Sequence, residues 1–246
     1  MTAGIIEAVN GARAARRPVA TVTDLSSGAM RMVLPETIAG DRLEPALADA
    51  FRTGKSCQAE DGRQFINVYL PAPRIVAVGA VHITQALAAL APVCGFALSV
   101  VDPRSGFATP ERFAGVDLLV DWPEDAFAAQ PLDEFTALAA VSHDPGMDDP
   151  ALIAALKARC FYIGALGSRR SHAQRVERLS AAGVSDEDLG LIHAPIGVDI
   201  AAATPQEIAV AILAEIIAAL RRPDRAATGR IAAQAPRARA ACLVDG

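Results

Sequence analysis

The chain has 246 residues, of which 52% are hydrophobic and 21% charged, and its formal net charge is −5. This composition excludes wholesale disorder and a fibrous repeat. The negative charge excludes a general nucleic-acid binder, because neutralising phosphates requires a basic surface. The most apolar stretch, residues 209–220, is short and interrupted by Glu215, so we expect a cytoplasmic protein without a membrane span.

The first 70 residues predict a small α+β domain. Their periodicity indicates a helix near 4–16, two strands around the Ser26-Ser27-Gly28 turn, a helix near 41–53 and a strand at 64–70. The segment Pro71-Ala72-Pro73 follows, and two prolines around one residue predict a linker.

From residue 74 to 221 the pattern changes to continuous apolar strands that alternate with helices. Such strands are typical of a parallel sheet covered on both faces, so the sequence predicts a Rossmann-like doubly wound domain. The expected strands are 74–80, 96–102, 116–120, 136–142, 160–166 and 189–194, and the expected helices before the last one are 82–94, 149–159 and 168–183.

The last helix has a clear start signal. Thr204 is the expected N-cap, Pro205 the first helical residue, and Glu207 completes a capping box. The helix is expected to run to about Leu220, before Pro223 stops it. The remaining residues, 222–246, are rich in Ala, Arg and Pro without a period and predict a mobile tail.

Four cysteines, at positions 57, 94, 160 and 242, form no CxxC pair and no Cys/His cluster. We therefore expect no structural zinc and no metal site. Cys94 and Cys160 lie in apolar runs and are expected in the core. Cys57, in a polar stretch, is the candidate for a reactive thiol.

In a doubly wound sheet, ligands bind beyond the carboxyl ends of the strands. The first such end carries Gly79 and His82, and the second carries Asp102 and Arg104. Asp102 lies where a dinucleotide-binding fold places the acid that contacts ribose. The glycine fingerprint, however, is broken, because Val81 and Thr84 replace its second and third glycines. The sequence thus permits NAD(P) but disfavours it.

The fourth strand end carries Ser142, His143 and Asp144. His143 borders the expected crevice, where an imidazole can act as a ligand or an acid/base. Asp148 and Asp149 follow closely, and we expect one of them to cap the next helix.

The fifth strand end predicts an anion site. It carries Gly164 and Gly167, then Ser168, Arg169 and Arg170 at the start of a helix. Helix N-terminal amides, a hydroxyl and two cations together favour phosphate binding over the alternative, a tight turn with solvated arginines. After the sixth strand, an apolar loop from His193 to Asp199 either lines the same pocket or packs on the N-terminal domain.

Five segments carry a resemblance to a known family. In chain order they are GAVHI, VDPRSGFATPERF, HDPGMDDPAL, FYIGALGSRRSHAQRVERL and IHAPIGVDIAAATPQEIAVAILAEI. Over residues 74–221 the chain resembles the XdhC/CoxI family, including its CoxF-like members.

This resemblance implies an accessory role rather than metabolic catalysis, and it assigns no catalytic residue. It implies binding of the molybdenum cofactor, a phosphorylated pterin, and help in its sulfuration and insertion into a molybdenum hydroxylase of the xanthine dehydrogenase or aerobic carbon monoxide dehydrogenase type. The phosphate would lie on the amides of Gly167 and Ser168 beside Arg169 and Arg170, as the anion site predicts. Asp102 and Asp199 would hydrogen-bond the pterin, and His143 would approach the metal end.

The implied partners are the hydroxylase apo-enzyme and a cysteine desulfurase or sulfurtransferase, and a homodimer is the default assembly. Two alternatives stay open. The fold and Asp102 fit an NAD(P)-dependent oxidoreductase, and the cationic tail with the apolar loop fits a scaffold that bridges the two partners without holding cofactor.

Overall fold

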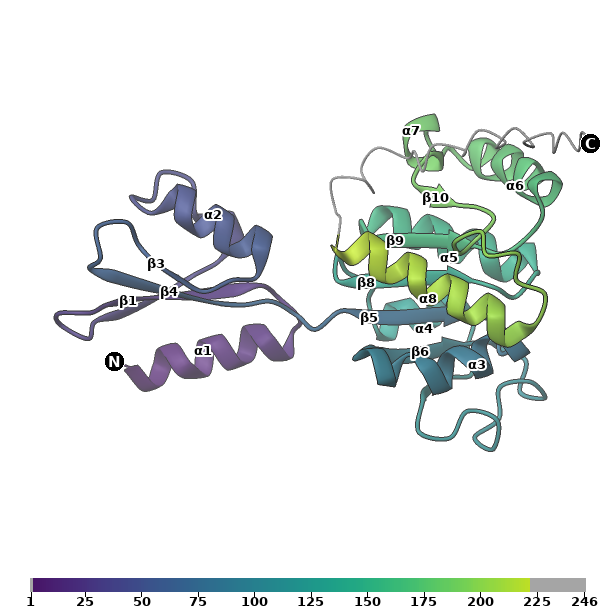
Figure 1. The fold of residues 1–246 in the computed structure, drawn as a ribbon, viewed down its shortest axis with the longest axis horizontal. Helices are drawn as coiled ribbons and strands as arrows, with labels where there is room; N and C mark the ends of the chain where they lie inside the picture. The colour runs from purple at the N-terminus through teal and green to yellow at the C-terminus, as the bar shows by residue number, and fades with distance from the viewer. Residues whose placement is uncertain (1, 222–246) are drawn as a thin grey trace, which may run out of the picture. The chain divides into compact units, whose positions relative to one another are not determined.

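The computed structural model describes residues 2–221 and divides into two units, the first ending at Ala72 and the second beginning at Pro73. In the first unit, strands β2, β1, β4 and β3 form an antiparallel sheet in that order (Figure 1). Its elements are α1 (Thr2–Ala14), β1 (Val19–Asp24), β2 (Met30–Val33), η1 (Pro35–Thr37), α2 (Glu44–Thr53), β3 (Cys57–Gln58) and β4 (Gln64–Tyr69). Leu47 of α2 packs with Ile66 and Val22 of the sheet in the unit's core.

The predicted turn between β1 and β2 is confirmed. Gly28 takes the positive φ of 70° that the turn requires. Asp24 accepts hydrogen bonds from the amides and hydroxyls of Ser26 and Ser27, and these bonds hold its pKa well below the usual value.

The second unit contains a six-stranded parallel sheet with the order β10-β9-β8-β5-β6-β7, which confirms the doubly wound Rossmann prediction. The chain runs outward from β5 in one direction to β7 and in the other to β10, so the strand order reverses between β5 and β8. Its elements are β5 (Arg74–Val78), α3 (His82–Leu90), η2 (Pro92–Cys94), β6 (Ala97–Val101), β7 (Asp117–Leu119), α4 (Pro123–Ala129), β8 (Thr136–Ala140), α5 (Pro145–Lys157), β9 (Tyr162–Ala165), α6 (Arg169–Ala181), α7 (Asp186–Leu189), β10 (Ile192–His193) and α8 (Pro205–Arg221).

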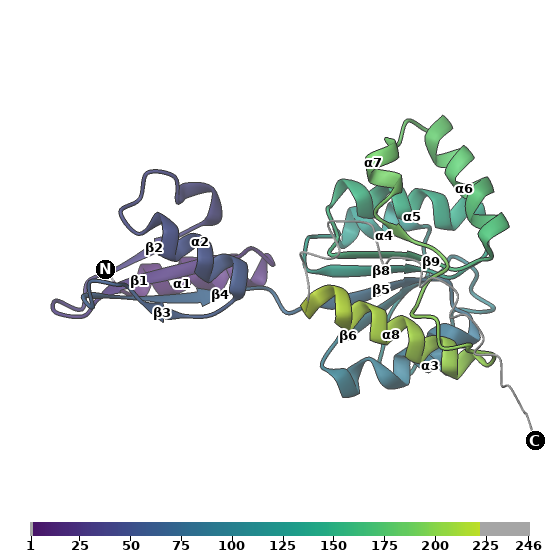
Figure 2. The ribbon, with the colours of Figure 1, turned by 45° about the horizontal axis from the view of Figure 1, so that its top comes forward.

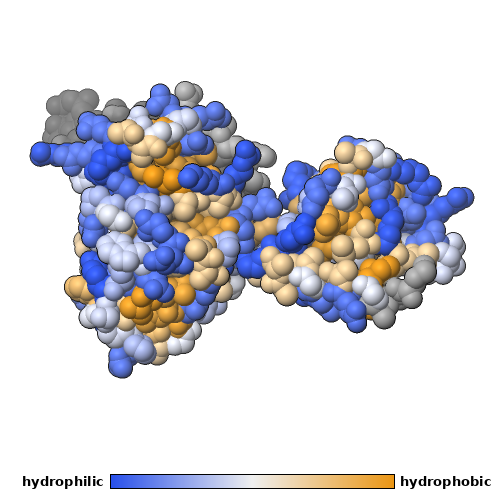
Figure 3. All heavy atoms as spheres, turned by 180° about the vertical axis from the view of Figure 1, so that it is seen from behind, coloured by the Kyte–Doolittle hydropathy of each residue, from blue (hydrophilic) through white to orange (hydrophobic). Residues whose placement is uncertain are grey.

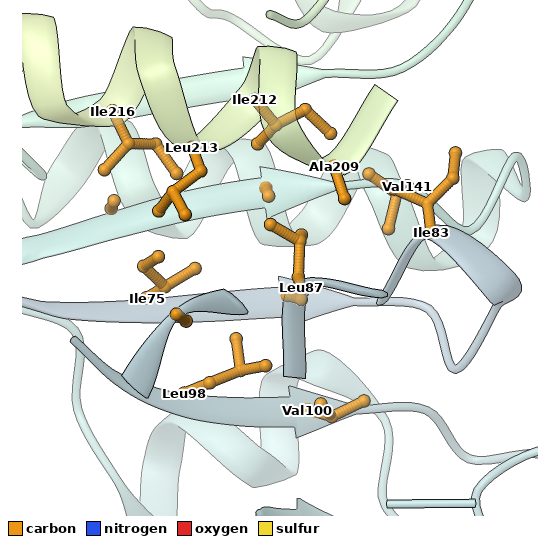
Figure 4. Close-up of a cluster of buried hydrophobic side chains, with 14 of the residues drawn as sticks. Ile75, Ile83, Leu87, Leu98, Val100, Val141, Ala209, Ile212, Leu213 and Ile216 are labelled. Carbon is orange, nitrogen blue, oxygen red and sulfur yellow. The ribbon is translucent and has the colours of Figure 1, made fainter. Parts of the chain in front are cut away.

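Helices cover both faces of this sheet, which is why its central strands are apolar throughout (Figure 2). On one face, Leu87 of α3 and Ile212 of α8 pack over Ile75 of β5 (Figure 4). On the other face, Met147 and Leu152 of α5 belong to a second core with residues from α4, α6 and α7. Two separate hydrophobic cores, one on each face of the sheet, thus hold the strands and their carboxyl ends in place.

The start of α8 is as predicted. The Thr204 hydroxyl accepts from the Glu207 amide at 3.2 Å, and the Glu207 carboxylate accepts from the amides of Thr204 and Ala203. The helix continues to Arg221. The predicted tail at 222–246, with Cys242, lies outside the described residues.

The start of α5 corrects a prediction. The helix begins at Pro145, and its N-cap is Asp144, whose carboxylate accepts from the Gly146 amide at 2.9 Å. Asp148 and Asp149, one of which was expected to cap it, lie inside the helix. The helix also contains Pro150, whose missing N–H costs one backbone hydrogen bond near the first turn.

The cysteine predictions are confirmed at one position and wrong at another. Cys160 is buried, and burial raises the pKa of its thiol to about 12. Cys94 is exposed rather than in the core, because η2 ends there and Gly95 turns the chain away. Cys57, at the edge strand β3, is half-buried.

On the face that Figure 3 shows, the apolar surface of each unit forms patches surrounded by polar side chains. Large apolar side chains at the surface include Phe107 and Trp122. Among the helices that the structure describes, none combines the length and hydropathy needed to cross a membrane.

Candidate functional site

The turns after β5 and β8 press against each other at the point where the strand order reverses. Gly79 has a φ of 115°, and a Cβ there would lie 2.7 Å from both the N and the Cα of Ser142. The Gly79 carbonyl also accepts from the Thr84 hydroxyl at 2.5 Å. Gly79, predicted as a cofactor contact, therefore allows close packing between two turns. His82 begins α3 and is exposed.

Asp102 corrects the prediction of a ligand-contacting acid. Its side chain is fully buried, and Oδ2 accepts from the Ala80 amide at 2.7 Å. Arg104 donates to both carboxylate oxygens through Nε and Nη2, at 2.9 and 2.7 Å. Burial alone raises the pKa of Asp102, but the hydrogen bonds from Arg104 and Ala80 outweigh it and lower the pKa. The carboxylate is thus used within the protein, where it ties the turn after β6 to the turn after β5.

Arg104 retains a partly open side chain. Its guanidinium lies over the ring of Phe107 at 4.8 Å, and 36% of its side chain is exposed. The fork with Asp102 fixes the plane of the guanidinium. Arg104 therefore offers a fixed cationic surface at the end of β6.

His143 lies in the turn after β8 with a left-handed φ of 65° and an exposed side chain. Arg16, Arg159 and Ala201 also have a positive φ, a conformation that costs energy for residues other than glycine. The neighbours of His143 hold the turn in place. The Ser142 hydroxyl donates to Oδ1 of Asp148 at 2.7 Å, and Asp144 caps α5. Burial raises the pKa of Asp148.

The turn after β9 has the donors that the sequence predicted. Gly167 takes a φ of 140°, Ser168 is the N-cap of α6, and its hydroxyl accepts from the Ser171 amide at 3.2 Å. Arg169 and Arg170 are the first two helical residues and are exposed. At a helix start, amides such as theirs point outward without intrahelical partners and favour an anion.

A buried arginine lies under this turn. Arg175 is 5% exposed, and its Nη2 donates to the Leu166 carbonyl at 2.9 Å. The same nitrogen lies 3.8 Å from Oδ2 of Asp148. The sequence gives no signal for the burial of Arg175, apart from its helical spacing from the apolar Leu179.

Gly164, His193 and Asp199, also predicted as cofactor contacts, make contacts of other kinds. Gly164 is buried in β9, and a Cβ there would meet Ile196 and the Tyr162 hydroxyl at 2.6 Å, so the residue allows close packing. Asp199 is exposed, and its carboxylate accepts from the Ala201 amide at 3.3 Å.

His193 belongs to a network that the sequence did not reveal. Its Nδ1 lies 3.1 Å from Oε1 of Glu215, and Oε2 of Glu215 accepts from the Tyr162 hydroxyl and the Gly197 amide at 2.6 and 2.7 Å. Burial alone raises the pKa of Glu215, but hydrogen bonds from His193 and Tyr162 outweigh it and lower the pKa. Glu215 thus joins α8 to β9 and β10. The only sequence signal was an acid inside an apolar helix.

Within the described part of the chain, no three His, Cys, Asp or Glu side chains gather as a metal-binding group.

Comparison with known proteins identifies the family of this domain. Residues 75–216, more than half of the chain, match the XdhC Rossmann domain. The chain belongs to the XdhC family. The matched range contains the turns after β5, β6, β8 and β9.

Three curated relatives are similar over parts of their length. The uncharacterized protein YqeB of Escherichia coli is 33% identical over 62% of this chain and 28% of its own length. The molybdenum cofactor insertion chaperone PaoD of E. coli is 38% identical over 37% of this chain and 29% of its length. A Bacillus subtilis protein, named as a probable xanthine dehydrogenase subunit, is 30% identical over 74% of this chain and 55% of its length. The chain thus spans about half, or less, of each of these relatives.

A crystal structure of a xanthine dehydrogenase from Bacillus halodurans shows the same fold. Its TM-score is 0.60 at 24% identity, and the likeness covers 94% of this chain and 66% of that one.

Proposed function

We propose that the chain is a maturation chaperone that binds the molybdenum cofactor and assists its sulfuration and insertion into a molybdenum hydroxylase. The observation that carries this proposal is the donor set at the start of α6, an anion site inside an XdhC Rossmann domain. The relative PaoD, named as a molybdenum cofactor insertion chaperone, supports it.

The residues at this edge fit a phosphorylated pterin. The outward amides at the start of α6 suit a phosphate, and Arg169 and Arg170 add positive charge beside it. Underneath, buried Nε and Nη1 of Arg175 have no hydrogen-bond partner among the described residues, so this end of the site is short of negative charge. When bound, the cofactor supplies the molybdenum centre on which the target hydroxylase depends.

The chain's own residues hold and orient this cargo. The amides of Gly167 and Ser168 would anchor the phosphate, and His143, exposed and with a positive φ at the switch point, would approach the metal end. Arg104 offers its fixed guanidinium on the other side of β5. The proposal assigns no catalytic residue.

The proposed partners are a molybdenum hydroxylase apo-enzyme, of the xanthine dehydrogenase or carbon monoxide dehydrogenase type, and a sulfurtransferase. The homodimer and the cytoplasmic location stay predictions from the sequence.

The test is cofactor retention by the chain purified from a molybdenum-replete host. Elemental analysis measures molybdenum, and fluorescence of the oxidised pterin measures the organic part. We expect both in comparable molar amounts in the wild type and several-fold less in R169A/R170A, because two charges beside the phosphate are lost. The control K157A/R63A removes two exposed charges elsewhere and should retain the cofactor.

Two outcomes would contradict the proposal. A chain free of pterin that still binds its target hydroxylase would be a scaffold. A chain that binds NADPH with micromolar affinity and turns it over would be an oxidoreductase.

A further inference from the structure

The orientation of one peptide group determines whether the turn after β9 can bind an anion. In a trans peptide, the carbonyl oxygen and the next N–H point in opposite directions. The Leu166 carbonyl points inward, because it accepts from Nη2 of the buried Arg175 at 2.9 Å. The Gly167 N–H of the same peptide therefore points outward, in the direction of the free amides at the start of α6.

Gly167 permits this peptide orientation. Its φ of 140° is a conformation that side-chain-bearing residues rarely adopt, and an added Cβ would lie 3.2 Å from Cβ of Ser171. On its other side, the Leu166 amide donates to the Ala140 carbonyl at 2.8 Å, so β8 holds the turn from behind. The turn is thus held at two points, by β8 through the Leu166 amide and by Arg175 through the Leu166 carbonyl.

The hydrogen bonds of Arg175 are unusual for a buried charge. The described residues give Nε and Nη1 no hydrogen-bond partner, and the facing carboxylate of Asp148 is 3.8 Å from Nη2. Burying an arginine with so few partners is unfavourable for the folded state. A purely structural role would be served better by an apolar residue of similar size, so the charge at this position needs a reason connected with the turn.

We propose that Arg175 is the positioning residue of the anion site. Its guanidinium holds the Leu166–Gly167 peptide with the Gly167 N–H facing the ligand, and does not contact the ligand itself. The inference rests on the proposed function, because it takes the start of α6 as the binding site for the phosphate of the cargo.

The same guanidinium joins the anion site to the turn that carries His143. Asp148 faces Arg175 and accepts from both the hydroxyl and the amide of Ser142, at 2.7 and 3.3 Å. Ser142 in turn packs against Gly79. Arg175 and Asp148 therefore fix the spacing between the phosphate end of the site and the turns at the switch point.

Inorganic phosphate is the probe, and binding is followed by calorimetry and by the backbone amide NMR signals of Gly167 and Arg170. We compare wild type with R175M, which removes the guanidinium but keeps much of the volume, and with R175K. The matched control is R178M. Arg178 lies one turn along α6 and pairs with Asp149 of α5, so its loss also removes a contact between these helices without touching the turn.

We expect R175M to bind phosphate roughly tenfold more weakly than wild type, as for the loss of one charge-assisted hydrogen bond. Its Gly167 signal should no longer respond to phosphate. R175K should lose affinity several-fold, because a flexible, strongly hydrated ammonium does not keep the fixed geometry with which Nη2 of the planar guanidinium meets the Leu166 carbonyl. R178M should bind like the wild type even where its thermal stability falls.

Three results would overturn the inference. They are a folded R175M with wild-type affinity, an R175K with wild-type affinity and an unchanged Gly167 response, or an R178M that weakens binding as much as R175M. If R175M does not fold, R175K decides alone. A wild type that does not bind phosphate removes the proposed function instead, so the two failures are distinguishable.

Discussion

The turns after β5 and β9 have the same architecture but differ in their backbone amides. The amides of the first turn donate hydrogen bonds within the protein, whereas the Gly167 amide of the second points outward. Each joins a parallel strand to a helix through a glycine with a positive φ, 115° at Gly79 and 140° at Gly167. In the first turn, the Gly79 amide donates to the Val101 carbonyl and the Ala80 amide to Asp102. In the second, the peptide after Leu166 turns its N–H outward.

This difference determines which of the two turns keeps a free amide. In the first turn a carboxylate of the protein, Asp102, takes the place that an incoming anion would need at the amide of Ala80. In the second turn a guanidinium, Arg175, binds the carbonyl and leaves the amide free. A charged side chain beneath each turn thus binds one end of a peptide group: Asp102 binds the Ala80 amide, and Arg175 binds the Leu166 carbonyl.

The comparison predicts its largest effect at Gly79. G79A should lower the free energy of unfolding by about 3 kcal/mol or more, because the new Cβ meets the backbone of Ser142 at 2.7 Å in a strained conformation. Urea unfolding measures the loss. The control G95A also introduces a Cβ at a positive φ, of 81°, but into open space, and should cost only about 1 kcal/mol. Equal losses would show that the two turns do not press on each other.

A smaller effect is expected at Asp102. D102N should lower the free energy of unfolding at pH 7 by about 2 kcal/mol, since it breaks a buried charge-assisted fork with Arg104. The pKa of Asp102 is lowered in the folded state, so the unfolded chain binds more protons as the pH falls below 3.8. Wild type should therefore lose this contribution on acidification.

The measurement is a series of urea unfolding curves from pH 7 to pH 2. The difference between wild type and D102N should shrink as the pH falls, while phosphate binding at pH 7 stays within about twofold, because Asp102 serves the other turn. A difference that is independent of pH would contradict the assigned charge state of Asp102.

Local patterns were enough to predict most of the fold. Continuous apolar strands between helices indicate a buried parallel sheet, and the capping box at Thr204 locates α8, because both signals lie within a few residues. The expected cap of α5 was wrong because three acids, Asp144, Asp148 and Asp149, lie close together near its start, and the sequence alone does not show that Asp144 is the one that caps it. Cys94 was misjudged because an apolar neighbourhood does not reveal that a short helix ends at the surface.

The sequence could predict the position of a candidate site residue only where that residue directly follows a strand. His143 and Ser168 follow strands, so the sheet rule places them at the carboxyl edge. The partners of a side chain depend on contacts between residues far apart in the sequence. From its position in the sequence Asp102 was expected to contact a ribose, but its oxygens accept from the Ala80 amide and Arg104. The sequence likewise did not show that Glu215 contacts His193 and Tyr162. A charged residue in a sequence does not show whether another side chain or amide of the folded protein already pairs with it.

The smallest predicted effect concerns the cap of the open turn. S168A should lower the free energy of unfolding by about 1 kcal/mol, because the Ser171 amide loses its acceptor. S185A, which removes the equivalent cap of α7, should cost a similar amount. Thermal unfolding with and without phosphate then distinguishes S168A from S185A by how much stability phosphate restores to each. An anion at the start of α6 can accept from the Ser171 amide in place of the lost hydroxyl, so phosphate should restore S168A more than S185A. Equal restoration of both variants would place the bound anion elsewhere than at the turn after β9.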